Sequence, residues 1–129
     1  MLDRRHQEIE LLRKKYGLLE YGSNLDWILF KEIQLPPGWN RTSTPLLVLI
    51  PPGYPVTPPD NFYVPIGFRL SSGAMPSNYN ESQSHLGQQW GQFSFHPKTE
   101  DWKPASDILD GDNLLTFTLA VERRLKEVN

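Results

Sequence analysis

A serine and a histidine that could cooperate chemically lie two residues apart in the chain. Ser94 carries a hydroxyl, and His96 carries an imidazole that could act as its base. In an extended segment, side chains at positions i and i+2 point to the same face. A serine hydroxyl becomes an effective nucleophile when a base takes its proton. The pair therefore admits nucleophilic chemistry, while an exposed histidine without a chemical role is the simpler interpretation of His96.

Four aspartates follow this pair within a short segment: Asp101, Asp107, Asp110 and Asp112. The last two immediately precede an apolar pattern of helical period. An aspartate at the start of a helix accepts hydrogen bonds from its free N–H groups and is favoured by the helix dipole. We therefore interpret Asp110 and Asp112 first as capping residues.

The composition excludes several classes of site. The 129 residues contain no cysteine, which excludes disulfides, thiolate zinc sites and a cysteine nucleophile in this chain. Three histidines leave little material for a metal centre, and a formal charge of −2 provides no basic field for nucleic acid or anionic membranes. No apolar run approaches the ~20 residues that span a bilayer, and the N-terminus lacks the apolar core of a secretion signal. We expect a cytoplasmic protein without metal or cofactor.

The elements that must position these residues follow from the hydrophobic pattern. Ile9, Leu12 and Tyr16 recur at helical spacing, which predicts a helix over residues 3–16 with Asp3 as its cap and Gly17 at its end. Strand patterns follow at residues 26–33, 46–50 and 62–64, and a proline-rich connection at 51–60 joins the last two. A polar surface loop at 70–92 and a second helix from 110 onward come next. This order predicts a single α+β domain over residues 1–129, with antiparallel strands and a helix at each end.

Three motifs together resemble the ubiquitin-conjugating (E2) superfamily. Tyr54–Pro59 reads Tyr-Pro-x-x-Pro-Pro, as in the segment that follows the third strand of that family. Gly91–Phe95 is similar to the family's active-site stretch Gly-x-Ile-Cys-Leu, with Ser94 at the cysteine position. Trp102–Ala105 matches the family's Trp-x-Pro-Ala and begins eight residues after Ser94, which is the family's spacing.

The sequence also departs from the family's pattern. His85 lies near the place of the His-Pro-Asn element, but Leu86 and Gly87 replace its proline and asparagine. The chain ends after one long helix, whereas fuller members carry further C-terminal helices. These departures resemble a divergent bacterial branch of the superfamily, whose members tend to be encoded beside an E1-like enzyme, a ubiquitin-like protein and a JAB-type metalloprotease.

The resemblance implies a four-stranded antiparallel meander with an N-terminal and a C-terminal helix. It also implies a carrier that accepts a ubiquitin-like protein from an E1-like enzyme by transthioesterification and passes it to a target amine. His85 would then stabilise the oxyanion or orient a group beside Ser94. One acidic residue of the following loop, such as Asp101 or Asp107, would orient and deprotonate the incoming amine.

The resemblance further implies a partner surface on the N-terminal helix. In the family this helix docks on the E1, which here assigns E1 binding to the basic residues Arg4, Arg5, Arg13 and Lys14. An ordinary solvated helix face is the alternative interpretation.

Ser94 itself has two explanations. Serine could replace a natural cysteine as an inactivating change, because the two side chains are nearly isosteric and an oxyester resists attack better than a thioester. Alternatively, serine is native and the domain is an E2 variant that binds a ubiquitin-like protein or an E1 without transferring anything. Unlike a thiol, a hydroxyl without a base cannot run the family's cycle.

Overall fold

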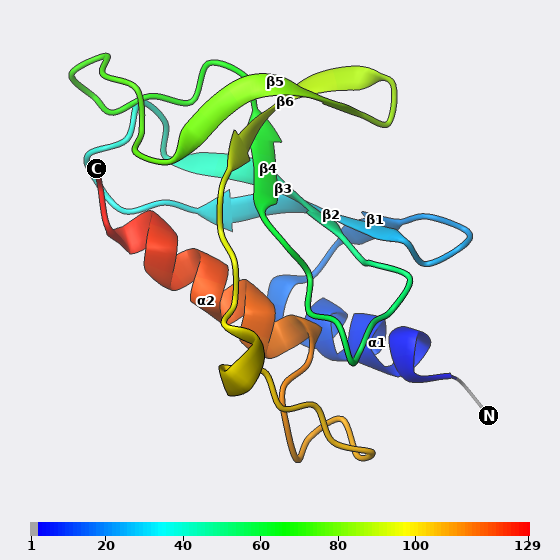
Figure 1. Ribbon diagram of the computed structural model, residues 1–129. Coiled ribbons are helices and arrows are strands. Elements are labelled where there is room, and N and C mark those ends of the chain that lie inside the picture. Colours follow the sequence, from blue (N-terminus) through cyan, green and yellow to red (C-terminus); the bar gives the residue numbers. More distant parts are fainter. Residues whose placement is uncertain (1–2) are drawn as a thin grey trace.

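Over residues 3–129, the computed structural model shows one antiparallel sheet with two helices on one of its faces (Figure 1). In chain order the elements are α1 (Arg4–Tyr16), β1 (Leu19–Tyr21), β2 (Trp27–Gln34), β3 (Ser43–Leu49), β4 (Phe62–Pro65), β5 (Tyr79–His85), β6 (Gln88–Phe93), the short 3₁₀ helix η1 (Thr99–Asp101) and α2 (Leu114–Lys126). The strand order is β1-β2-β3-β4-β6-β5. The predicted α+β class is confirmed. The first two residues of the expected domain lie outside the described residues.

Helix α1 begins and ends as the sequence predicts. The Asp3 carboxylate accepts a hydrogen bond from the His6 N–H at 3.0 Å and caps the first turn. Gly17, with a φ of 76°, donates its N–H to the Arg13 carbonyl and closes the last turn. Neither α1 nor any other helix of residues 3–129 has the length and apolar character needed to cross a bilayer.

Helix α2 is capped one residue later than predicted. The Asn113 side chain accepts from the Thr116 N–H at 2.9 Å, and the Thr116 hydroxyl accepts from the Asn113 N–H at 3.0 Å. This reciprocal capping box makes Asn113 the N-cap, so the prediction of Asp110 or Asp112 was wrong. Asp112 instead closes the preceding loop, where its carboxylate accepts from the Lys103 N–H at 2.8 Å.

Alternate side chains of the central strands build the core beneath the helices. Phe30 of β2 and Phe62 of β4 are at most 1% exposed and belong to the same buried cluster as Phe117 of α2. Phe93, the last residue of β6, stacks on Phe62 with ring centres 4.9 Å apart. The end of β6 is therefore anchored in the core.

Residues 79–93 form a hairpin, although the sequence predicts a surface loop over residues 70–92. β5 and β6 pair around Leu86 and Gly87, whose φ values of 53° and 76° are both left-handed. Two successive left-handed residues are typical of a two-residue hairpin turn, for which Asn-Gly and Asp-Gly are the usual sequences. Leucine is not such a signal. The loop prediction and the four-stranded meander are therefore wrong here, because this hairpin adds two strands to the sheet through pairing of β6 with β4.

Candidate functional site

Ser94 directly follows the last residue of β6 and is exposed. Its N–H donates to the Asn78 carbonyl at 2.8 Å. The next N–H, that of Phe95, donates to the Asn61 side-chain oxygen at 3.0 Å, and the Asn61 N–H donates to the Phe95 carbonyl at 2.7 Å. Two separate segments therefore hold the backbone around Ser94 while the residue itself stays open to solvent.

The side chains around Ser94 alternate between core and solvent. The Phe95 ring lies against Phe62 and Phe117, with ring centres 5.6 and 5.8 Å apart. Ser94 and His96, on either side of Phe95, are both exposed. Such alternation is typical of extended backbone. The structure thus places Ser94 and His96 on the same side of this segment, away from the core.

The imidazole of His96 contacts a carboxylate. Its Nδ1 forms a hydrogen bond with Oδ1 of Asp60, the residue just before the Asn61 that brackets Phe95. The two side chains are 64% and 61% exposed, so this contact lies at the surface. Asp60 was not among the residues predicted for the site.

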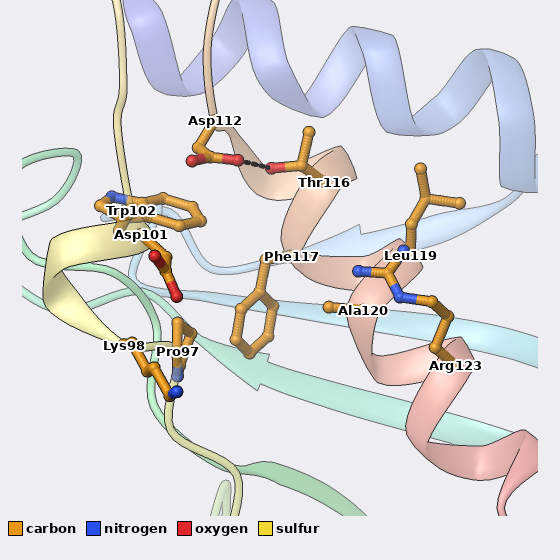
Figure 2. Close-up of a pocket in the computed structure, with 10 residues that line it drawn as sticks. All are labelled: Pro97, Lys98, Asp101, Trp102, Asp112, Thr116, Phe117, Leu119, Ala120 and Arg123. Atoms are coloured by element: carbon orange, nitrogen blue, oxygen red, sulfur yellow. Dashed lines mark hydrogen bonds between the residues drawn. The ribbon is translucent and has the colours of Figure 1, made fainter.

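A groove with a volume of about 360 Å³ separates the segment after Ser94 from α2 (Figure 2). Trp102 and Phe117 contribute apolar surface, and Lys98, Asp101 and Arg123 contribute charge. Within residues 3–129, the Asp101 carboxylate accepts no hydrogen bond from the chain. Of the two aspartates predicted to assist an amine, Asp101 therefore lines a groove with its carboxylate unengaged.

The other predicted aspartate, Asp107, lies in the loop before α2. Its carboxylate accepts from the Leu109 N–H at 2.9 Å, and its carbonyl accepts from the Asp110 N–H at 3.0 Å. These are the bonds of a tight turn. Asp107 does not line the groove, and its contacts shape the loop.

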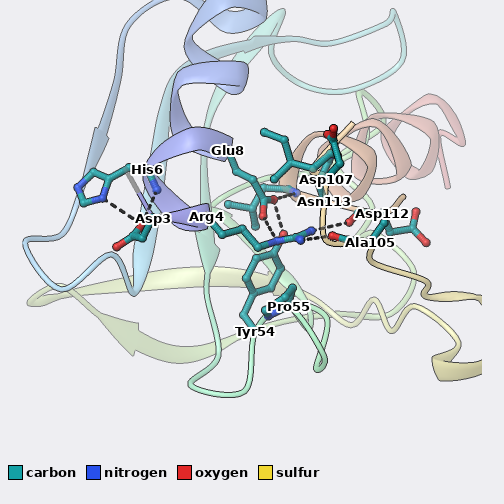
Figure 3. A network of polar contacts seen from close by, with 12 residues as sticks. Asp3, Arg4, His6, Glu8, Tyr54, Pro55, Ala105, Asp107, Asp112 and Asn113 are labelled. Carbon is teal, nitrogen blue, oxygen red and sulfur yellow. Dashed lines mark hydrogen bonds and ion pairs between the residues drawn. The ribbon is translucent and has the colours of Figure 1, made fainter. Parts of the chain in front are cut away.

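A buried carboxylate on α1 ties together the loops that support the groove (Figure 3). Glu8 is 0% exposed and accepts from Arg4 Nε at 2.7 Å, from the Leu114 N–H at 2.6 Å and from the Tyr54 hydroxyl. Burial raises the pKa of Tyr54 above its ordinary value, and the hydrogen bond with Glu8 raises it further. Because a buried charge is tolerated only with such partners, Glu8 fixes the start of α2 relative to the proline-rich segment.

The two most specific motifs of the sequence meet in space. The Trp102 indole donates to the Pro55 carbonyl at 2.7 Å, and the Trp102 and Tyr54 rings lie 6.3 Å apart. These contacts join the Tyr-Pro-x-x-Pro-Pro and Trp-x-Pro-Ala segments. Both motifs therefore act here as structural supports of the groove.

His85 lies beside the hairpin turn and pairs with Gln88, the first residue of β6, whereas Ser94 follows the last residue of that strand. Its ring packs edge-on against Tyr63 with centres 4.6 Å apart, and its carbonyl accepts from the Trp90 indole at 2.9 Å. Within residues 3–129, its buried Nε2 has no hydrogen-bond partner. The resemblance implied that His85 lies beside Ser94. The structure instead places His85 away from Ser94 and gives it a packing role.

The four basic residues predicted to bind a partner fall into two groups. Arg4 and Arg5 each donate to two backbone carbonyls of neighbouring loops, which engages them within the fold. Arg13 and Lys14 are exposed, and Arg13 forms an ion pair with Glu10 at 2.6 Å. Only Arg13 and Lys14 of this set remain on an open face of α1.

Three polar residues of the site and its supports were missed at the level of sequence. Asp60 and Asn61 follow two prolines and read as part of a turn; the φ of 63° at Asn61 fits the tolerance of asparagine for left-handed backbone. Glu8 follows Arg4 by four residues, a spacing typical of exposed pairs on a helix. An acidic residue beside the apolar Ile9 was the available signal for its burial.

A family of known proteins matches nearly the whole chain. The family described as Prokaryotic E2 family E matches residues 6–128, from α1 to the residue after α2 and its cap. No curated protein and no solved structure matches the chain.

Proposed function

The chain belongs to prokaryotic E2 family E, and we propose that it is an E2-like carrier whose residue 94 accepts the C-terminal acyl group of a ubiquitin-like protein. The observation that carries this proposal is the exposed position of Ser94 on a backbone held by Asn78 and Asn61. A flexible C-terminal tail can reach such a residue, and a rigid backbone keeps the reacting atom oriented.

In the proposed cycle, an E1-like enzyme presents the acyl group as a thioester, residue 94 takes it, and a target amine removes it. Each step passes through an oxyanion that needs hydrogen-bond donors. The N–H groups of Ser94 and Phe95 already donate to other residues. We therefore propose that the side-chain amide of Asn61 donates a hydrogen bond to the oxyanion, and that the unengaged carboxylate of Asp101 orients the acceptor amine.

We also propose that the open face of α1 binds the E1-like enzyme. Arg13 and Lys14 supply exposed positive charge there, whereas Arg4 and Arg5 are engaged in loop contacts. Exposed charges mainly steer association and set its salt dependence. The proposed surface is therefore narrower than the one that the sequence predicts.

The carrier proposal is tested with Ser94→Cys, incubated with the cognate E1-like enzyme, ATP and the ubiquitin-like protein. A covalent adduct that a thiol reagent removes is the expected result, because a thiolate attacks a thioester readily. Ser106→Cys, which places a thiol at another exposed serine, is the matched control and should give none. Absence of an adduct on Ser94→Cys, with the E1-like enzyme shown to be charged, would refute the carrier function.

The lack of cysteine in all 129 residues favours a second candidate, a non-catalytic E2 variant that binds the ubiquitin-like protein or the E1. Its discriminating result is saturable binding by the intact chain together with no adduct on Ser94→Cys.

A further inference from the structure

His96 already has the partner that a general base requires. Its Nδ1 contacts the Asp60 carboxylate, which favours the tautomer with the proton on Nδ1. Nε2 is then the basic nitrogen, and within residues 3–129 it is not hydrogen-bonded to any group. A carboxylate that orients a histidine in this way also stabilises the imidazolium that forms when the histidine takes a proton.

Ser94 is the hydroxyl that this nitrogen can serve. The two residues flank the inward-facing Phe95 and are both exposed, so their side chains leave the segment on the same side. The Ser94 hydroxyl forms no hydrogen bond with any other group of residues 3–129. A base and nucleophile that are apart in the free protein commonly draw together only when substrate binds.

We propose that Ser94, His96 and Asp60 act as nucleophile, base and orienting carboxylate, so that the serine itself accepts an acyl group from a thioester. The inference rests on the carrier function proposed above. It makes the covalent intermediate on residue 94 an oxyester of serine in place of a thioester of cysteine. Ser94 and His96 touch the reacting atoms, whereas Asp60 is a positioning residue that acts through His96.

The atoms balance in both half-reactions. In the first, the Ser94 oxygen bonds to the thioester carbon, His96 Nε2 takes the hydroxyl proton, the carbon–sulfur bond breaks, and the leaving thiolate takes that proton from His96. In the second, the acceptor amine bonds to the ester carbon and loses a proton to His96 Nε2. The carbon–oxygen bond then breaks, and the proton passes to the Ser94 oxygen. Neither step oxidises or reduces any group.

A fluorophosphonate probe tests the activation of Ser94 without any partner protein, because it forms a stable phosphonyl ester with an activated serine and releases fluoride. We expect one label on the intact chain, located at Ser94 by mass spectrometry, and none on Ser94→Ala. His96→Gln should slow labelling by about 100-fold or more, as for loss of a general base. Asp60→Asn should slow it by at least about tenfold, since the amide no longer fixes the tautomer.

The chain contains a matched control, a second surface pair in which His6 Nδ1 contacts Asp3 Oδ1 at 3.1 Å. Asp3→Asn and His6→Gln should leave labelling unchanged. The labelling rate of the intact chain should depend on pH, and this dependence should vanish in His96→Gln. A structural effect of the substitution would lower the rate at every pH without removing its dependence.

Two further results separate this inference from the carrier function. With charged E1-like enzyme, the intact chain should form an adduct that hydroxylamine cleaves and that mild thiol leaves in place. If Ser94→Cys forms its thioester while the intact chain forms neither ester nor label, the carrier function stands and the serine mechanism is refuted. If Ser94 is labelled with the expected dependence but Ser94→Cys forms no adduct, Ser94 is an activated serine and the carrier function is refuted.

Discussion

The buried carboxylate of Glu8 should contribute more to stability than any other side chain of similar size on α1. Glu8→Gln conserves the shape of the side chain but replaces one acceptor oxygen with an NH₂ group. That NH₂ group faces either the Arg4 guanidinium or the pair formed by the Leu114 N–H and the Tyr54 hydroxyl. In either orientation, donor faces donor in a site with no exposure to water.

The size of the effect follows from these contacts. Removing one partner of a buried ion pair costs about 3–5 kcal/mol, and each buried donor left unpaired costs about 1–3 kcal/mol. The Arg4 side chain is 19% exposed and keeps two carbonyl partners, so its stranded charge is partly relieved. We therefore expect Glu8→Gln to lower the free energy of unfolding by about 3 kcal/mol, against a total of ~5–15 kcal/mol for a typical domain.

Urea unfolding followed by tryptophan fluorescence measures this change as a shift of midpoint at constant slope. Glu10→Gln is the matched control, because Glu10 lies on the same helix and its ion pair with Arg13 is 52% exposed on the glutamate side. Such exposed pairs contribute about 0.2–1 kcal/mol. Tyr54→Phe removes only one of the three donors to Glu8 and should cost about 1 kcal/mol. If Glu8→Gln destabilises no more than Glu10→Gln, the assignment of Glu8 as the support of the α2 start is refuted.

Two further predictions concern the hairpin and α1. The pKa of Glu81 is lowered to about 2, chiefly by its hydrogen bond with Arg69. The contribution of ionised Glu81 to the free energy of unfolding is therefore present above its ordinary pKa of 4.5 and is lost as the pH falls from there toward 2. Acid unfolding should show that Glu81→Gln removes about 1 kcal/mol of stability at pH 7 and little at pH 2, and an equal loss at both values would contradict the ionic origin. Reversing Arg13 and Lys14 to glutamate should weaken binding of the E1-like enzyme more at ~50 mM than at ~300 mM salt, whereas Lys126→Glu on α2 should leave this binding unchanged. Titration calorimetry at the two salt concentrations measures both affinities. The proposed surface on α1 is wrong if the double reversal changes neither of them.

The parts of the fold that could be predicted have local causes. The α1 boundaries depend on Asp3 and Gly17, which act on the backbone within one turn, and both were predicted. The β3 strand was visible as the apolar run at residues 46–50, because this part of the strand is buried on both sides: Leu46 and Val48 lie in the main core, and Leu47 lies in a second buried cluster with Tyr63 and Trp90. The capping of α2 was missed by one residue, since aspartate and asparagine are nearly equivalent caps and the choice depends on the reciprocal bond with Thr116.

The two larger errors, the missed hairpin and the missed Asp60 contact, concern residues far apart in the chain, and the first error led to the second. The hairpin was missed because its turn uses Leu86 in a left-handed conformation, for which the sequence carries no signal. Without the hairpin, β6 has no place beside β4, and nothing brings the residues before Phe62 next to those after Phe93. His96 could thus be named as a candidate base from its spacing to Ser94, whereas its contact with Asp60, 36 residues away in the chain, could not be predicted.

This dependence on register explains why the site looks degenerate in the sequence and organised in space. In the sequence, Leu86 and Gly87 follow His85, and serine occupies position 94. The pairing of Phe62 with Phe93 brings two polar side chains from another segment to this place: the Asn61 amide and the Asp60 carboxylate lie beside the exposed residues 94–96. A serine hydroxyl depends on a base more than a thiol does, because a thiol with an ordinary pKa of about 8.5 is already partly ionised at neutral pH. The Asp60–His96 contact is therefore the observation on which the proposal of serine as a nucleophile at this strand end rests.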